Sequence, residues 1–316
     1  MTISKRYRER MASVSPMFSS SDGFRLLACD ADSIIYRVAA TTNNLETAKR
    51  RFVQQAMTLQ LLAGADMVRL HLTPKHCRKA GRFNVLAVKE YQGNRKNSKG
   101  KPALVEPLRY AVGRKKLDLP PDMEVVFNDV YEADDSVIMD GVKWGDSCVI
   151  YSEDKDLLCT RNMMLCPETS LVLPGLPSPS VGTLALKELS SSKKVVGRGP
   201  LFFWAQMLMG DTADNIAGLT KYLGKQVGPV RTWDLLSHWS GTQNTEFEVA
   251  HFVLSCYREN GQNPWPEGWL LWLYPEEGHT FHKYLNKLGI MQDAELGPWL
   301  QEQLRLKWFN KETDND

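Results

Sequence analysis

Apolar residues in the first half of the chain follow strand and helix patterns in turn. Apolar runs at 24–29, 67–72, 124–127 and 148–151 predict four strands. Apolar residues also recur every three to four positions from Leu45 to Leu62, and again over 133–144, which predicts two helices. Because strands that alternate with helices pair in parallel, we expect an α/β fold with a mostly parallel central sheet flanked by helices.

The strand pattern ends near residue 200. Helical spacing then recurs over 202–209, 230–239, 247–257 and 296–309, which predicts a helical second domain. We expect Trp265, Trp269 and Trp272 to lie in apolar packing there. The start of the chain is basic and serine-rich, as is typical of a tail. The predicted organisation is a tail over 1–22, an α/β domain over 23–200 and a helical domain over 201–316.

Charge is unevenly distributed along the sequence. The net charge is only +2, yet residues 75–118 contain thirteen Lys or Arg and three acids. Gly81, Gly93, Gly100 and Pro102 interrupt any long helix in this segment. A solvated loop normally carries both signs, so this excess predicts contact with phosphates.

Composition excludes several classes of protein. With 43% hydrophobic residues the chain can form a buried core. No apolar stretch approaches the roughly 18 residues that span a bilayer, and the N-terminus lacks the apolar core of a secretory signal. The six cysteines form no C-x-x-C pair, so neither a zinc ribbon nor a disulfide framework is indicated. We therefore expect a soluble cytoplasmic protein without a membrane partner.

Four acidic motifs carry the candidate chemistry, and three of them follow predicted strands. Groups beyond the carboxyl ends of parallel strands face one crevice, so these motifs should converge. Converging carboxylates repel one another unless hard divalent cations lie among them, which predicts magnesium, and two ions suit phosphodiester hydrolysis. The motif residues are Asp30 and Asp32; Glu132, Asp134 and Asp135; Asp154 and Asp156; and Asp211 and Asp214.

Each acidic motif also has an ordinary structural interpretation when taken alone. Asp134 or Asp135 can cap the helix that follows, Asp30 can end a strand in a turn, and Asp211 can cap Thr212 onward. Four motifs in order, flanking a basic segment, favour a metal site instead.

Over residues 24–235 the chain resembles the 5′-nuclease superfamily of flap endonucleases, polymerase 5′-nuclease domains and tailed-phage exonucleases. The resemblance rests on the motifs L-L-A-C-D-A-D, K-E-Y-Q-G-N-R, Y-E-A-D-D, I-Y-S-E-D-K-D, M-G-D-T-A-D-N-I-A-G and G-L-T-K-Y-L-G-K-Q. It is nearest to the exonucleases of short-tailed phages of the T-seven type. The resemblance implies a PIN-like α/β core, a basic arch over 75–118 and a helix-hairpin-helix element over about 211–236.

The resemblance also implies an activity. A member of this family would be a 5′-to-3′ exodeoxyribonuclease with flap activity that uses two Mg²⁺ ions, replaceable by Mn²⁺, and leaves 5′-phosphate products. Its partners would be double-stranded DNA with 5′ ends or flaps, RNA–DNA hybrids and unidentified replication proteins. Its setting would be phage DNA replication, RNA primer removal and host DNA degradation in the host cytoplasm.

Roles for individual residues follow from the resemblance. It assigns Asp30, Glu132 and Asp134 to one metal site, with Asp135 close by, and leaves Asp32 either as a ligand or as a structural residue. The second metal site would hold Asp154, Asp156, Asp211 and Asp214. The basic gateway beside the scissile phosphate would hold Arg78, Lys79, Lys89, Arg95 and Lys96. DNA contacts would come from Tyr91, Gly93 and Asn94, and from Gly218, Lys221, Gly224 and Lys225 in a hairpin that can also take K⁺.

Two positions depart from the family pattern. Gln92 stands where many relatives carry a lysine, so the activating cation must come from another residue of the basic segment. Thr73 stands where short-tailed-phage relatives carry an aspartate ligand, and we expect its hydroxyl to hold a metal-bound water.

Two alternatives to a nuclease stay open at this point. C-D-A-D-S, Leu72-Thr73 and G-D-T-A-D-N resemble, in order, the motifs of haloacid-dehalogenase phosphatases, but in that class the last motif must end a strand. The change at Thr73 also allows a catalytically impaired DNA-binding relative. Metal-dependent release of nucleotides from 5′ ends separates the three hypotheses.

Overall fold

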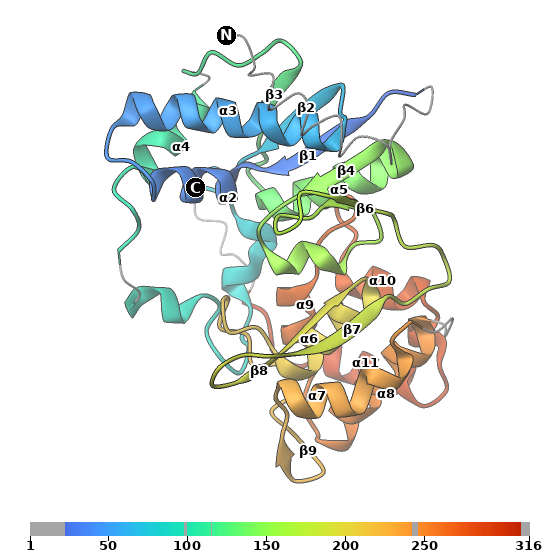
Figure 1. Ribbon diagram of the computed structural model, residues 1–316. Coiled ribbons are helices and arrows are strands. Elements are labelled where there is room, and N and C mark those ends of the chain that lie inside the picture. Colours follow the sequence, from blue (N-terminus) through green and yellow to red (C-terminus); the bar gives the residue numbers. More distant parts are fainter. Residues whose placement is uncertain (1–22, 98–99, 115, 242–245, 311–316) are drawn as a thin grey trace. The chain divides into compact units, whose positions relative to one another are not determined.

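The computed structural model describes all residues except 1–22, 98–99, 115, 242–245 and 311–316, so the predicted tail lies outside the described residues. The chain divides into two compact units (Figure 1). Unit 1 comprises residues 1–77, 101–155 and 162–175, and unit 2 comprises 78–100, 156–161 and 176–316. The units are interleaved in sequence, and the division into domains 23–200 and 201–316 stays a prediction.

Unit 1 is built on a six-stranded sheet in the order β3-β2-β1-β4-β5-β6. Its first five members pair in parallel, and β6 pairs antiparallel with β5. β2 and β3 lie on one side of β1, and the chain then continues with β4 on the other side. The sheet therefore has a topological switch point between β1 and β4. The strands are β1 (Leu26–Asp30), β2 (Met67–His71), β3 (Met123–Val126), β4 (Cys148–Tyr151), β5 (Met163–Leu165) and β6 (Val172–Leu173).

Helices pack against this sheet because both of its faces are apolar. β1 is buried along its whole length, and Leu27 and Cys29 belong to a core that also contains Phe52 of α3 and Leu108 of α4. Figure 1 shows the long helix α3 running beside the sheet. α3 starts at Asn44, whose side chain accepts from the amide of Thr47, and ends at the left-handed Gly64. The helices are α2 (Ala31–Ala39), α3 (Leu45–Ala63), α4 (Val105–Gly113) and α5 (Ala133–Trp144).

Unit 2 is mainly helical, as predicted for the second half of the chain. Its central helix, α6, is buried on all sides from Pro200 to Leu208 and forms the core with Trp265, Phe281 and residues of α8. Trp265 is fully buried, and Trp269 and Trp272 pack against the same core, which confirms the packing role predicted for these tryptophans. The helices are α6 (Pro200–Met209), α7 (Pro229–Leu236), α8 (Glu246–Glu259), α9 (Trp265–Leu271), α10 (Phe281–Lys287) and α11 (Leu296–Arg305).

Strands also occur in unit 2, which the sequence patterns did not predict. β7 (Thr183–Glu188) and β8 (Lys193–Arg198) form an antiparallel hairpin, and β9 (Lys221–Tyr222) and β10 (Lys225–Gln226) form a shorter one. The expectation that strands end near residue 200 is therefore wrong for β9 and β10. Their two-residue turn, Leu223-Gly224, has positive φ at both residues, as hairpins with such short turns require.

Candidate metal centre

Asp30 ends β1 at the switch point and is 4% exposed. One of its carboxylate oxygens, Oδ1, accepts the backbone N–H of Asp32 at 2.9 Å and that of Ser33 at 3.3 Å, so Asp30 caps α2. The other oxygen, Oδ2, accepts the hydroxyl of Ser152 at 2.9 Å. Burial and the negative charge of Asp32 raise the pKa of Asp30 to about 7, although these hydrogen bonds lower it.

Asp134 lies in the first turn of α5, whose start places several acids together. Burial raises the pKa of Asp134 most, followed by the negative charges of Asp30, Asp154, Glu132 and Asp135. These neighbours come from β1, from the segment after β4 and from the start of α5. The predicted convergence of acidic motifs at the carboxyl ends of strands is thus observed within unit 1, where Asp30, Glu132, Asp134 and Asp154 form the unit 1 acidic cluster.

Ser152 forms hydrogen bonds with two segments of the unit 1 acidic cluster, the end of β1 and the segment after β4. It follows β4, is buried, and accepts the backbone N–H of Asp154 at 2.9 Å while its hydroxyl donates to Asp30. The sequence analysis did not single out Ser152. Its only signal is its place between strand β4 and the S-E-D-K-D acids.

Asp135 has a capping role in α5. It is fully buried, and its carboxylate accepts the backbone N–H of Glu132 at 3.2 Å, which completes a capping box with the Glu132 side chain. The ordinary interpretation of an acid at a helix start therefore applies to Asp135, and its predicted closeness to the metal stays a prediction.

Asp32 and Thr73 form a separate network beside the cluster. The carboxylate of Asp32 accepts from the guanidinium of Arg109 at 2.6 Å and from the backbone N–H of Thr73 at 3.1 Å. The hydroxyl oxygen of Thr73 in turn accepts the backbone N–H of Ala133 at 2.9 Å, at the first residue of α5. Asp32 thus has structural partners, and Thr73 fixes the start of the helix that carries Glu132 and Asp134. Whether Thr73 also holds a metal-bound water stays a prediction.

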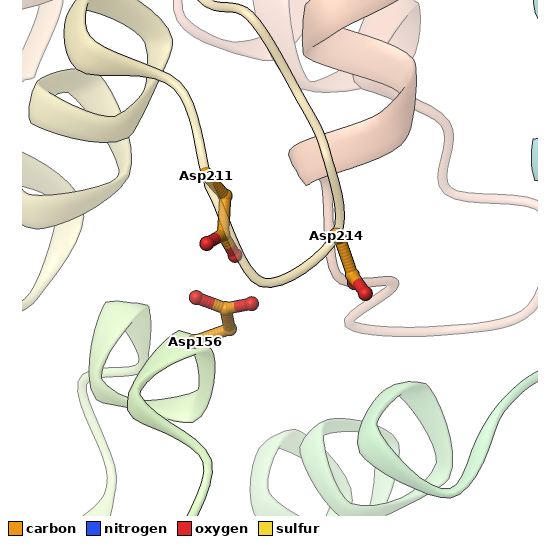
Figure 2. A group of neighbouring side chains, drawn as sticks. All are labelled: Asp156, Asp211 and Asp214. Atoms are coloured by element: carbon orange, nitrogen blue, oxygen red, sulfur yellow. The ribbon is translucent and has the colours of Figure 1, made fainter. Parts of the chain in front are cut away.

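Unit 2 holds a second group of carboxylates, which we call the unit 2 acidic cluster: Asp156, Asp211 and Asp214. One oxygen from each lies within 4.8 Å of the others. Figure 2 shows Asp156 and Asp211 facing one another, with Asp211 and Asp214 on two arms of one loop. An all-carboxylate group at this spacing has the donor set that hard divalent ions prefer. Asp154, predicted to join these three, neighbours Asp134 instead, so its assignment to the second metal site stays a prediction.

Buried contacts fix the unit 2 acidic cluster. The amide of Gln206, a fully buried residue of α6, donates to Asp156 at 2.5 Å. Asp211 is 2% exposed and accepts the backbone N–H of Ala213 at 2.9 Å. A Cβ added to Gly210 would lie 2.2 Å from the carbonyl oxygen of Ile216, so only glycine fits at this close approach. Gln206 was not predicted, because a polar residue in an apolar helix has no distinctive sequence pattern.

Asp214 is held by the basic segment. Its carboxylate forms an ion pair with Arg95, accepts the amide of Gln92 at 3.0 Å and accepts the hydroxyl of Tyr91 at 3.4 Å. The backbone N–H of Gln92 also donates to the Asp214 carbonyl at 2.9 Å. Lys79 donates to the Gln92 side chain at 3.2 Å. Gln92 therefore contacts both Lys79 and Asp214, and Arg95 contacts Asp214 directly.

The remaining predicted gateway and hairpin residues have varied environments. Asn94 donates to the carbonyl of Thr212 at 2.8 Å, Gly93 lies beside Glu90, and Arg78 and Lys89 are exposed. The side chain of Lys96 lies outside the described part of the chain. In the hairpin, Lys221, Gly224 and Lys225 are exposed, whereas Gly218 packs against Gly210 and is buried. The contacts of all these residues with DNA stay predictions, as does K⁺ at the hairpin.

The phosphatase alternative does not fit the structure. In that class the last acidic motif must end a strand, but Asp211 follows the helix α6.

The predicted arch over 75–118 is divided between the two units, because residues 78–100 belong to unit 2 while α4 packs in the core of unit 1. Its role as one gateway stays a prediction.

Comparison with known proteins shows the fold. No family model matches the chain, and no curated protein matches its sequence. The T5 D15 protein co-crystallized with metal ions aligns with a TM-score of 0.50 and 14% identity, over 89% of this chain and 98% of that one. A bacteriophage T5 D15 flap endonuclease variant, in a pseudo-enzyme–product complex with DNA and metal ions, aligns at 0.49 and 14% over the same shares. A T5 5′-exonuclease mutant aligns at 0.42 and 15%.

The first of these alignments covers nearly the whole of both chains, so this chain has the fold of the T5 D15 protein, which confirms the predicted fold class. Among the described residues, no helix has the length and apolarity that crossing a membrane requires.

Proposed function

We propose that the protein is a divalent-metal-dependent 5′-nuclease that hydrolyses DNA phosphodiesters. The observation that carries this proposal is the pair of acidic clusters, one in each unit, on the fold of a protein co-crystallized with metal ions. A structurally similar flap endonuclease is in complex with DNA. The proposed reaction class is 5′-to-3′ exonucleolytic and flap cleavage.

The residues present fit divalent metal. In the unit 1 acidic cluster, burial and mutual repulsion raise the pKa values of Asp30 and Asp134, which a cation among the oxygens would reverse. In the unit 2 acidic cluster the three carboxylates already lie at ligand spacing. Bound Mg²⁺ or Mn²⁺ would supply Lewis acidity toward the phosphodiester and lower the pKa of water.

The protein's own residues supply orientation and charge. Ser152 fixes the positions of the Asp30 carboxylate and the Asp154 backbone through hydrogen bonds to both, and the Gln206 amide fixes Asp156 in the same way. Arg95 and Lys79 bring positive charge to the edge of the unit 2 acidic cluster, where a phosphate would be held. Attack of water on phosphorus with departure of the 3′ oxygen would leave a 3′-hydroxyl on the released fragment and a 5′-phosphate on the remaining strand, whose next nucleotide would then be released with that phosphate. RNA–DNA hybrids and a role in phage DNA replication belong to this proposal as further expectations.

End-group analysis tests the proposed function. Duplex DNA with a 5′ single-stranded flap is incubated with Mg²⁺, Mn²⁺ or excess chelator, and the released products are analysed for terminal phosphate. We expect metal-dependent release of mononucleotides or short oligonucleotides that carry 5′-phosphate. Products with 3′-phosphate, or full activity in chelator, would contradict the proposal.

A matched pair of variants controls this experiment. Asp30→Asn removes a charge from the unit 1 acidic cluster and retains an effective helix cap. Asp146→Asn removes an exposed acid that precedes β4, at the end of the sheet opposite the cluster. We expect cleavage to be lost in the first variant and kept in the second.

A further inference from the structure

The turn η2 (Lys79–Asn84) in unit 2 reverses the usual burial of apolar and charged residues. Phe83 is 60% exposed, whereas its neighbour Arg82 is 2% exposed. A folded chain normally buries the phenylalanine and leaves the arginine in water. The exposed ring of Phe83 therefore offers an aromatic face that a ligand can contact.

Hydrogen bonds with three tryptophans near the end of the chain fix the turn in this arrangement. Arg82 donates to the carbonyl of Trp272 at 2.8 Å, and the indole of Trp269 donates to the carbonyl of Ala80 at 3.2 Å. Leu86 donates its backbone N–H to Trp308 at 2.8 Å. The C-terminal helices and the residues after them thus form the support on which η2 is built.

The backbone of the turn also stores strain. Lys79, Ala80 and Gly81 have φ values of 51°, 50° and 73°, a left-handed run that non-glycine residues rarely adopt. The φ of Gly81 would strain any other residue at this position, and a Cβ there would also approach the ring of Phe309 to 3.0 Å. Strain of this kind persists where the surrounding structure imposes it, often at binding sites.

The surroundings of the Phe83 ring suit a nucleotide. The ammonium of Lys79 lies 5.3 Å from the ring centroid. Tyr91 packs edge-to-face on Phe83, with centroids 5.4 Å apart, and its hydroxyl reaches Asp214 of the unit 2 acidic cluster. Tyr91 is only 5% exposed, so it supports Phe83 but offers little ring surface to a ligand. One side chain therefore connects the exposed ring to a candidate metal ligand.

We propose that Phe83 is a stacking platform for a nucleobase of single-stranded 5′ DNA, with Lys79 contacting the adjacent phosphate. This inference rests on the proposed function and adds a base contact to it. Phenylalanine has no hydrogen-bonding group, so the contact accepts any base. Stacking of this kind depends on the aromatic face, which an aliphatic side chain lacks.

Binding in chelator, where no cleavage is expected, tests the platform. The probe is a DNA hairpin duplex with a 5′ single-stranded tail, compared with the same probe carrying abasic sites along the tail. Removal of an aromatic platform typically weakens binding by roughly 5- to 100-fold per stacked base. We expect Phe83→Leu to lose about tenfold in affinity for the intact tail, and Phe83→Trp to retain affinity. Affinity for the abasic tail should be the same in all three proteins.

Leu86→Ala is the matched control, because Leu86 is 44% exposed on the same segment but is not aromatic. It should bind both probes like the unaltered protein, and thermal unfolding should show that Phe83→Leu is folded. Unchanged binding of the intact tail by Phe83→Leu, or an equal loss on the abasic tail, would overturn the platform. If Mg²⁺-dependent cleavage is normal while Phe83→Leu binds normally, only this inference fails. If the unaltered protein cleaves no DNA, the proposed function fails, and the binding result stands separately.

Discussion

The two acidic clusters differ in how their charge is balanced. In the unit 1 acidic cluster, burial and neighbouring carboxylates raise the pKa values of Asp30 and Asp134. In the unit 2 acidic cluster, Asp214 forms an ion pair with Arg95, and Asp156 accepts from Gln206. In the first cluster the pKa values thus report burial and repulsion among carboxylates, whereas in the second Asp214 is paired with a cation of the segment proposed to contact DNA.

This difference separates two uses of a carboxylate. Repulsion in the unit 1 acidic cluster costs folding stability, and a bound cation or a proton would reduce this cost. The contacts of Asp214 instead contribute stability and compete with metal for the same oxygens. We infer that metal binding stabilises unit 1 more strongly and displaces Arg95 from Asp214 in unit 2.

The largest expected effect is at Asp30. Asp30→Asn should lower the rate of Mg²⁺-dependent cleavage by about 1,000-fold or more. The reason is that the substitution removes a charged ligand, so the metal ion would no longer be held in its position. Single-turnover cleavage at saturating DNA measures this. A variant that regains the full rate at higher Mg²⁺ would show that Asp30 only strengthens metal binding.

The same substitution should raise stability without metal. The folded-state pKa of Asp30 is raised from 3.8 to about 7, so the folded protein binds its proton more tightly than the unfolded chain does. The contribution of this group is therefore favourable below about pH 4 and is lost as pH rises through about 7. We expect Asp30→Asn to exceed the unaltered protein in unfolding free energy by up to about 4 kcal/mol above pH 7. Denaturant unfolding in chelator from pH 4 to pH 8 checks the trend, and equal stability at both ends would refute it.

A smaller effect is expected at Thr73, which fixes the start of α5 through Ala133. Thr73→Val keeps the shape and removes the acceptor, so we expect about 1 kcal/mol lower stability. We also expect a tenfold or smaller rise in the Mg²⁺ needed for half-maximal cleavage. Thr73→Ser keeps the acceptor and should match the unaltered protein, whereas Thr73→Asp should lower the Mg²⁺ requirement. Loss of turnover in Thr73→Val equal to that in Asp30→Asn would contradict a positioning role.

The smallest effect concerns Arg95. Because Arg95 competes with metal for Asp214, Arg95→Gln should tighten Mn²⁺ binding without DNA by about threefold, the value of a partly exposed ion pair. The same variant should cleave DNA more slowly, since it loses the cation proposed to hold the phosphate. Arg50→Gln is the control, because Arg50 is an exposed residue of α3 in unit 1, outside residues 75–118. Weaker Mn²⁺ binding in Arg95→Gln would mean that Arg95 supports the metal site.

The sheet and its acids could be predicted from sequence because their signals are local. Apolar runs of four to six residues predicted the strands β1 to β4, and acids that follow such runs must meet where parallel strands end. The start of α5 was also predicted, from the helical stretch over 133–144, and the structure adds a capping box of Glu132 and Asp135 that was not predicted.

Other features depend on contacts between distant segments and could not be predicted. The hairpin β7–β8 has a weak strand pattern, because Leu184 is the one buried residue of β7 and Val195 is the one buried residue of β8. The partners of Asp154 and the role of Gln206 depend on packing that sequence spacing does not encode. The exposure of Phe83 was missed for the same reason, because its turn is held by Trp272, which lies 190 residues after Arg82, and by Trp308, which lies further still along the chain.

The central claim is that each acidic cluster binds a divalent ion, and Mn²⁺ titration calorimetry in the absence of DNA tests it most directly. We compare the unaltered protein with a unit 1 variant, Asp30→Asn with Asp134→Asn, and a unit 2 variant, Asp156→Asn with Asp211→Asn. We expect two bound ions in the unaltered protein and one in each variant, with thermal unfolding confirming that both variants are folded. A single bound ion that either variant abolishes, or two ions retained in both, would contradict it.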